Sequence, residues 1–457
     1  MVVRQAKRCA FATFRLHNQA PMSRIASFFR IPGLDPAVQK SFRREQLTEL
    51  TLPMALSLME GGFVAVVAAK TFNVPPWVIA VISAAPMFGN LSSYFWNRIA
   101  TGRPKVPLVT VLQVLVLLCV AAIALSPRSG AGTWIVLASV IFSRLLIAGI
   151  WTVRSVAWSL NYERSLRARA TAQLQALSSL VVVLATGLAG LVLDAHPQNF
   201  RWVYAAGAIF GALGVWAFRG VTVVGEKRHQ VLERRSQRAP GNRNAFLAIL
   251  RADPRYARYQ LHQFTSGAAN MMLEPPLVYL VTKQMGASYL ASITIMMLIP
   301  FLLNLATMPF WARYLDRVHV AEFRARQNSV WVLGILMMFW GAWELSLGWL
   351  AAGRVMTGIS NGGGSLAWQL GHNDFAPRDQ LSAYMGIHVT LTGVRGAFAP
   401  FLGMALYLGW DAKGYVPGTT GLGPWLFLVS AALGMVAWRG FHLLSREIGG
   451  RVGADSV

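Results

Sequence analysis

Apolar segments, each long enough to cross a membrane as a helix, recur about twelve times along the 457-residue chain. A helix needs roughly 20 predominantly apolar residues to span the hydrocarbon core of a bilayer. Hydrophobic residues make up 55% of the chain and charged residues only 13%, which is unlike a soluble protein. The sequence therefore predicts an all-α polytopic membrane protein with twelve transmembrane helices. They are expected near residues 47–70, 77–97, 106–126, 133–157, 170–194, 201–219, 259–282, 288–312, 327–345, 347–372, 380–408 and 424–444.

Basic residues are segregated between the expected loops. The chain has 42 Lys and Arg against 18 Asp and Glu. The termini and the even-numbered loops hold 33 of the 42, the odd-numbered loops hold five, and four lie inside expected helices. By the positive-inside rule both termini are expected in the cytoplasm, and we expect the membrane to be a bacterial inner (plasma) membrane. The net charge of +24 therefore reflects topology, and nucleic acid is not an expected partner.

Residues 1–46 precede the first expected helix and carry nine Lys or Arg. Their composition resembles that of a transit peptide. We interpret them as a basic cytoplasmic tail, or as the result of an early start codon with Met22 as the true first residue. Cys9 and Cys119 lie in this tail and in a helix, so no disulfide is expected.

The longest polar interval, residues 220–258, is predicted to be a cytoplasmic central loop between two sets of six helices, over 47–219 and 259–445. The two sets match each other weakly but in a constant order, which indicates duplication. We therefore predict two pseudo-symmetric six-helix bundles, followed by a cytoplasmic tail over 446–457. The matching positions, at offsets of 210 to 215 residues, are Glu60 and Glu274, Pro86 and Pro300, Asn90 and Asn304, 95–98 and 310–313, Arg144 and Arg354, Trp158 and Trp368, and Gly190 and Gly403.

Related motifs follow the second and eighth expected helices. "WNRIATGRPK" keeps Arg98, Gly102 and Arg103 of the pattern G-x-x-x-D-R-x-G-R-R, and "WARYLDRV" keeps Asp316 and Arg317. With its two parallel repeats and basic central loop, the chain resembles the major facilitator superfamily. The resemblance implies alternating access, a substrate site between two rocking halves, a cavity lined by helices 1, 4, 7 and 10, and gating loops that contain these five residues. The drug-antiporter signature of helix 5 is absent, so the subfamily stays open.

Four charged residues are expected deep inside helices 1, 4, 7 and 10. A charge at the bilayer centre costs roughly 2.5–3.5 kcal/mol, so each should have a partner. Counting about 1.5 Å per residue from the outer helix ends places Glu60 level with Arg144, and Glu274 level with Arg354. We predict one ion pair in each half. Each pair either ties its bundle together or takes part in coupling, with a carboxylate that gains a proton when the pair separates.

Helix 11 carries a polar stripe without a counterpart in the first half. Tyr384, His388 and Arg395 fall within about 60° on a helix of 3.6 residues per turn. Val182 occupies the position that matches Arg395. We predict that Arg395 binds the acidic group of a substrate, because a guanidinium forms bidentate bonds to carboxylate or phosphate, with His388, Tyr384 and Glu274 in the same site. The alternatives are a structural pairing of Arg395 with Glu274 or with a helix C-terminus, and a structural role for His388.

The predicted function is secondary active transport of a small organic solute, with an anionic solute as one option and protons as the coupling ion. The expected partners are the substrate, protons and the lipid bilayer, and the expected state is a monomer. The pattern "GISNG" at 358–362 matches a nucleophile elbow but lies in an apolar helical run, so no enzyme is expected. No HExxH, P-loop, dinucleotide or Cys-based metal pattern occurs, and we expect no metal or cofactor. The cluster His372, Asn373 and Asp374 is interpreted as a polar helix end, with a metal site as the alternative. A transport-inactive sensor or receptor with the same fold and a membrane-embedded enzyme are the alternatives.

Overall fold

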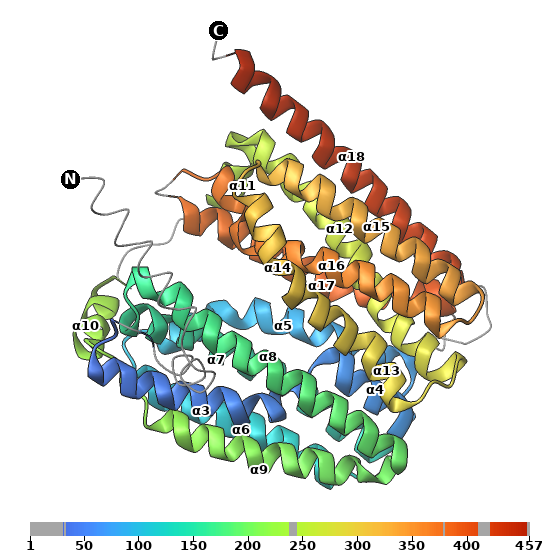
Figure 1. Ribbon diagram of the computed structural model, residues 1–457, viewed down its shortest axis with the longest axis horizontal. Coiled ribbons are helices and arrows are strands. Elements are labelled where there is room, and N and C mark those ends of the chain that lie inside the picture. The colour runs from blue at the N-terminus through green and yellow to red at the C-terminus, as the bar shows by residue number, and fades with distance from the viewer. Residues whose placement is uncertain (1–30, 32, 237–244, 378–379, 410–420, 455–457) are drawn as a thin grey trace, which may run out of the picture.

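The computed structural model consists of two helical bundles (Figure 1). It describes residue 31 and residues 33–236, 245–377, 380–409 and 421–454. Helices form wherever the sequence predicts a transmembrane span, and no strand occurs in this part of the chain. The predicted all-α class is therefore confirmed.

The first bundle contains six helical segments, and the first of them is broken. Pro36 and Pro76 begin α3 and α5, where the fixed φ of proline suits the first helical turn. The chain bends by 43° between α3 and α4, next to Gly61 and Gly62, which are poor helix formers. The elements are α3 (Pro36–Leu58), α4 (Gly61–Thr71), α5 (Pro76–Ala100), α6 (Lys105–Leu125), α7 (Gly130–Asn161), α8 (Arg164–Ala195), η1 (Pro197–Asn199) and α9 (Phe200–Arg219).

The second bundle repeats this order but breaks at other places. Two π-helical turns, η2 and η3, interrupt the segments that correspond to helices 7 and 8. Two short helices, α10 (Glu226–Ser236) and α11 (Ala245–Ala252), belong to the connection between the bundles. The other elements are α12 (Pro254–Tyr279), η2 (Leu280–Gln284), α13 (Tyr289–Ile293), η3 (Thr294–Leu298), α14 (Ile299–Leu315), α15 (Val320–Trp343), α16 (Leu347–Leu370), η4 (Gly371–Asp374), α17 (Leu381–Leu408) and α18 (Trp425–Ala454).

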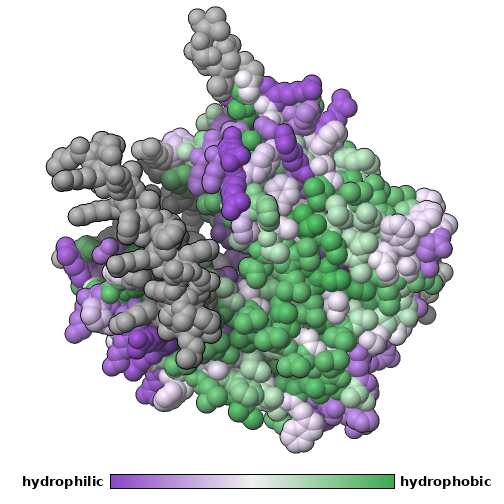
Figure 2. All heavy atoms as spheres, viewed as in Figure 1, coloured by the Kyte–Doolittle hydropathy of each residue, from purple (hydrophilic) through white to green (hydrophobic). Residues whose placement is uncertain are grey.

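The surface matches a bilayer environment. Among the described residues, seven helices are individually long and apolar enough to span a membrane, and the bent α3–α4 pair adds an eighth. Figure 2 shows an apolar band across the middle of the molecule, with hydrophilic residues toward its ends. Leu118, Leu188 and Phe310 are more than half exposed. Such a large continuous apolar surface is expected where side chains face lipid.

The start of α3, α10 and the end of the described part of α18 lie at one end of the two bundles (Figure 1). This end is called the connection end. The opposite end, with the α4–α5 turn and α13, is called the far end. The two halves lie side by side, and α5 of the first half packs along α17 of the second.

Three helix boundaries differ from those expected by seven residues or more. α3 begins at Pro36 rather than at 47, α15 begins at Val320 rather than at 327, and α18 continues to Ala454 rather than ending at 444. The side chains of Asp35 and His319 accept hydrogen bonds from amides in the first turns and so cap α3 and α15. These polar turns are invisible to a search for apolar runs. Residues 36–46 and 446–454 are therefore helical rather than parts of the expected tails.

Candidate functional site

A polar cavity of about 300 Å³ lies in the second bundle, between α12, α14, α15, α16 and α17. Its charged lining residues are Arg324 and Arg395, and no Asp or Glu is among the described residues that line it. The rest of the lining is mainly amide, hydroxyl and indole groups, such as those of Asn361, Ser365 and Trp368. The cavity therefore combines positive charge with neutral hydrogen-bonding groups.

Arg395 reaches from α17 to α12 and lines this cavity. The residue is 4% exposed, and its Nη1 donates a hydrogen bond to the carbonyl of Gln263. Its Nε has no partner among the described residues. The close approach requires glycine at 267, because a Cβ there would lie 2.1 Å from Cζ of Arg395. The guanidinium is thus held against α12 with part of its hydrogen-bonding capacity unused.

Arg324 on α15 is the second cation of the cavity, and it lies before residue 327, where the sequence predicts that this helix begins. It is 6% exposed, and its Nη1 donates to Oε1 of Gln327 at 3.1 Å. Gln327 in turn donates to the hydroxyl of Ser360 at 2.5 Å, which fixes the orientation of its amide. Nε and Nη2 of Arg324 are buried and have no partner among the described residues.

Two other residues of the predicted stripe lie outside the cavity lining. Tyr384 donates its hydroxyl to Oδ2 of Asp253 at 3.1 Å, toward the connection end. His388 is buried, and its Nδ1 lies 3.2 Å from Oε1 of Gln260. Its ring centroid is 5.5 Å from that of Trp368, which does line the cavity. His388 therefore lies behind one wall of the cavity, and Tyr384 lies farther along α17.

The structure brings Glu60 and Arg144 together. Nη2 of Arg144 lies 2.9 Å from Oε2 of Glu60 and also donates to the carbonyl of Met59 at 2.7 Å. Both acceptors lie at the break between α3 and α4, where the chain leaves a helical turn incomplete. Arg144 therefore donates a hydrogen bond to a carbonyl at the break and also balances the negative charge of Glu60.

The contact between Glu274 and Arg354 is looser. Nη1 of Arg354 lies 3.8 Å from Oε2 of Glu274. The same guanidinium donates to the carbonyls of Ile295 and Met296 at 2.9 and 2.8 Å, next to the π-helical turn η3. Glu274 is not among the residues that line the cavity with Arg395. The second half therefore repeats the charge pair but connects its arginine to a different helix.

Glu60→Gln should lower thermal stability more than the double variant Glu60→Gln/Arg144→Gln. The single change leaves the buried Arg144 without its carboxylate, and losing a hydrogen bond to a charged group costs about 1.5–3 kcal/mol. Because the side chain of Glu60 is 50% exposed, we expect the lower part of this range. Melting of the purified protein measures the effect. Glu322→Gln, which breaks the exposed pair with Arg326, is the matched control and should have little effect. Additive effects of the two neutralisations would contradict a coupled pair.

The two halves are joined at the far end. The hydroxyls of Thr71 and Tyr289 lie 3.0 Å apart, and Lys70 donates to the carbonyl of Ala287 at 2.5 Å. The carboxylate of Asp194 accepts the backbone amide of Tyr289 at 2.5 Å and that of Leu290 at 3.1 Å. These contacts link α4 and α8 of the first half to the start of α13 in the second, so the far end is closed.

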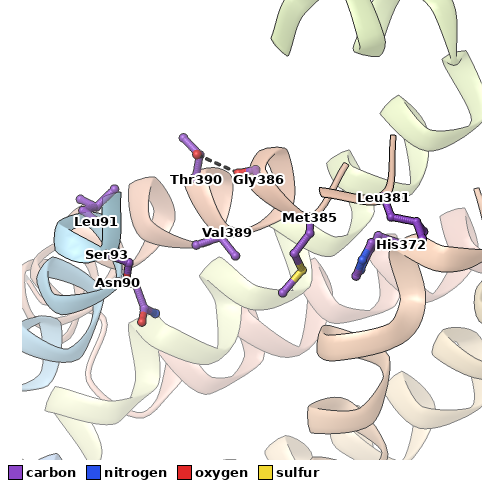
Figure 3. Close-up of a pocket in the computed structure, with 9 residues that line it drawn as sticks. All are labelled: Asn90, Leu91, Ser93, His372, Leu381, Met385, Gly386, Val389 and Thr390. Atoms are coloured by element: carbon purple, nitrogen blue, oxygen red, sulfur yellow. Dashed lines mark hydrogen bonds between the residues drawn. The ribbon is translucent and has the colours of Figure 1, made fainter. Parts of the chain in front are cut away.

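A second pocket of about 600 Å³ lies between the halves (Figure 3). Figure 3 shows Asn90 and Leu91 from α5 at one side, with Met385 and Val389 from α17 and His372 from η4 along the rest. η4 and the first turns of α17 lie at the connection end, and α5 also ends there. This pocket therefore lies between the halves, toward the connection end.

The sequence profile described as Major Facilitator Superfamily matches residues 50–325, more than half of the chain. The chain belongs to the major facilitator superfamily. Membership in this superfamily, together with the apolar helices, makes it an integral membrane transporter rather than an enzyme. No curated protein sequence matches it.

Solved structures of other transporters share the fold. The nucleoside transporter NupG aligns with a TM-score of 0.63 and 12% identity, over 90% of this chain and 99% of that one. A D-xylose-proton symporter aligns with a TM-score of 0.64 and 11% identity, over 88% and 96%. The xylose transporter XylE from E. coli, in an inward open conformation, aligns with a TM-score of 0.60 and 9% identity, over 88% and 94%. At these identities the likeness concerns the fold alone.

The first predicted gating loop, which contains Arg98, Gly102 and Arg103, packs against α10. Gly102, at φ +68°, donates its amide to Oε2 of Glu233 at 2.8 Å, and Lys105 forms a 2.7 Å ion pair with the same carboxylate. Partial burial acts to raise the pKa of Glu233, but the hydrogen bonds from Lys105 and Gly102 outweigh it and hold the pKa below its ordinary value. Arg98 and Arg103 are exposed. The loop is therefore fastened to the connection through its glycine and lysine.

The second gating loop is fastened differently. Asp316 follows α14 and donates its amide to the carbonyl of Ala312 at 3.0 Å, and the amide of Arg317 donates to the carbonyl of Tyr314 at 3.0 Å. The side chains of Asp316 and Arg317 are exposed. The next helix begins at Val320, whose amide donates to Oδ2 of Asp374 at 2.7 Å.

A buried charge cluster in the first bundle was not anticipated. Arg154 on α7 forms ion pairs with Glu45, at 3.0 Å, and with Glu49, both on α3. Trp158 and Tyr162 donate to Glu45 at 2.5 and 2.9 Å. Glu45 was expected in the tail, and the only signal for this cluster was Arg154, a helical arginine without an assigned partner. Three charges are thus buried between α3 and α7 near the connection end.

Proposed function

We propose that this chain is a secondary active transporter that moves a small organic anion across the membrane by alternating access, coupled to protons. The observation that carries the proposal is Arg395, a buried guanidinium that lines a polar cavity with an unpaired Nε. In the described part of the chain it forms no ion pair. An intramembrane charge without a protein partner indicates a ligand that supplies the opposite charge.

The conformation supports alternating access. The far end is closed by contacts between the halves, whereas a 600 Å³ pocket lies between α5 and α17 toward the connection end. The excess of basic loop residues favours a cytoplasmic position for the connection and both termini. With this orientation the structure is inward-facing, and the aligned XylE structure is described as inward open. Rocking of the halves would separate the far-end contacts and expose the cavity to the opposite side.

Three groups are candidates for carrying the coupled proton. Glu60 and Glu274 each face an arginine that also binds backbone carbonyls, so the guanidinium keeps partners when its carboxylate is neutralised. His388 is buried behind Trp368 and has an unpartnered Nε2 among the described groups. One structural neighbour is described as a proton symporter, which is compatible with this coupling.

Arg395→Lys should raise KM for anion transport about tenfold or more while leaving expression and folding intact. Lysine keeps the charge but loses the planar fork, and one lost charge-assisted hydrogen bond costs about 1.5–3 kcal/mol. The measurement is uptake of labelled small organic acids into vesicles that contain the purified protein, with and without an imposed pH gradient.

Arg326→Lys is the control, because Arg326 is exposed on the neighbouring helix α15. A pH gradient should increase uptake by the wild type and by this control. Full transport by Arg395→Ala would contradict the proposal. Binding without transport by the wild type would instead indicate a transport-inactive sensor.

A further inference from the structure

Two buried arginine side chains, and not only that of Arg395, line the polar cavity of the second bundle. Arg324 and Arg395 are 6% and 4% exposed and line the same cavity from α15 and α17. No described Asp or Glu lines this cavity, so the protein supplies no negative charge to either guanidinium there. Neither forms an ion pair in the described part of the chain. The other guanidinium groups buried in helices, those of Arg144, Arg154 and Arg354, all have carboxylate partners.

The unused hydrogen-bond donors of both arginines belong to this cavity. Nε of Arg395 and both Nε and Nη2 of Arg324 are buried without a partner among the described groups. Each guanidinium is nevertheless oriented by a single bond, from Arg395 to the Gln263 carbonyl and from Arg324 to the Gln327 amide. Such an arrangement holds the two planar guanidinium groups in place and leaves N–H donors free to bind a ligand.

We propose that the cavity binds a small organic dianion, with Arg324 as the second anion-binding residue beside Arg395. This inference rests on the proposed anion transport and specifies its substrate class. Two unpaired positive charges in a low-dielectric site are compensated when the ligand brings two negative charges, and a monoanion leaves one cation unpaired. A dicarboxylate and a phosphate monoester share this chemistry.

The size and the neutral lining are consistent with a short ligand. A volume of about 300 Å³ is at the lower limit of small-molecule pockets. The indoles of Trp331 and Trp368 form apolar surfaces of the lining, and Asn361 and Ser365 add neutral polar groups. A short carbon skeleton with an acidic group at one or both ends could contact the arginines, the indoles and the neutral polar groups at once.

Binding to the purified full-length protein at pH 8 tests the charge requirement. Succinate is compared with its monoamide and its diamide, which have nearly the same size but carry one charge and none. Glycerol 3-phosphate is compared with glycerol. We expect a dianion to bind at least tenfold more tightly than its less charged counterpart. Whether succinate or glycerol 3-phosphate binds more tightly identifies the kind of dianion.

The variant Arg324→Gln should bind succinate at least tenfold more weakly than the wild type while binding the monoamide about equally well. Arg326→Gln on the same helix is the matched control and should retain the preference for the dianion, because Arg326 is exposed. If Arg324→Gln fails to fold, Arg324→Lys keeps the charge and should keep part of the preference.

The outcomes separate this inference from the proposed function. If the wild type binds the monoamide as tightly as succinate, and glycerol as tightly as glycerol 3-phosphate, the dianion proposal is wrong. Anion transport that depends on Arg395 would still stand in that case. If vesicles take up none of the labelled acids, the proposed function fails as well.

Discussion

Replacing Arg154 by methionine should prevent the accumulation of folded protein. The side chain of Arg154 is 4% exposed and pairs with Glu45 and Glu49, whose side chains are 2% and 6% exposed. Arg154→Met removes the guanidinium that pairs with both carboxylates. Two negative charges then remain buried next to each other without a cation. Orphaning one partner of a buried pair costs about 3–5 kcal/mol, a large part of a typical stability of about 5–15 kcal/mol. The measurement is the yield and melting temperature of the purified protein.

Combining Arg154→Met with Glu45→Gln and Glu49→Gln should restore most of the lost stability. The amides still accept hydrogen bonds from Trp158 and Tyr162, and no charge stays buried. Arg326→Met is the control for loss of an exposed ion pair and should change the melting temperature little. Normal yield and melting of Arg154→Met alone would show that the cluster does not support the fold.

The helices and their duplication could be predicted because they depend on properties that the sequence displays directly. A span must be apolar over its length, and each half repeats the same order of spans and charges. Depth along a helix also follows from counting residues, so the contact between Glu60 and Arg144 could be expected. The bend beside Glu60 could not, since a glycine pair permits a break but does not require one.

Arg324, Glu45 and Glu49 were missed for one physical reason. Arg324 lies near the start of α15, and Glu45 and Glu49 lie in the polar N-terminal part of α3. In such segments the local sequence is the same whether a side chain faces water or a neighbouring helix. Packing decides between these outcomes, and here it buries all three residues. A search for apolar runs therefore begins these helices too late and assigns their charges to loops, tails or helix ends.

Tyr384 shows a different limit of helical periodicity. The angle around α17 places it on the same face as Arg395, but 11 residues separate them along the chain. At about 1.5 Å per residue this is roughly 16 Å along the helix axis, too far for one small ligand to contact both. A shared helix face therefore does not imply a shared site, because a shared site also requires similar depth in the membrane.

Gly267→Ala should weaken the binding of anions at least tenfold without unfolding the protein. A Cβ at 267 would lie 2.1 Å from Cζ and 2.2 Å from Nη1 of Arg395, so the two groups cannot keep their places. The atoms that must move are the end of a flexible side chain, which makes the change tolerable for the backbone of α12. Alanine is also the better helix former by about 0.8–1.0 kcal/mol, so stability should be maintained.

Gly364→Ala provides a control in the same cavity. Its Cβ would lie 3.6 Å from Nε2 of Gln327 and 3.9 Å from Nη1 of Arg324, which are ordinary contacts. Titration with the tighter-binding dianion should therefore show at least a tenfold loss of affinity for Gly267→Ala and near-normal affinity for Gly364→Ala. Equal affinities for the two variants would mean that the position of Arg395 does not matter for binding. A loss in both, with melting temperatures unchanged, would instead mean that any added methyl group fills the space that the ligand needs.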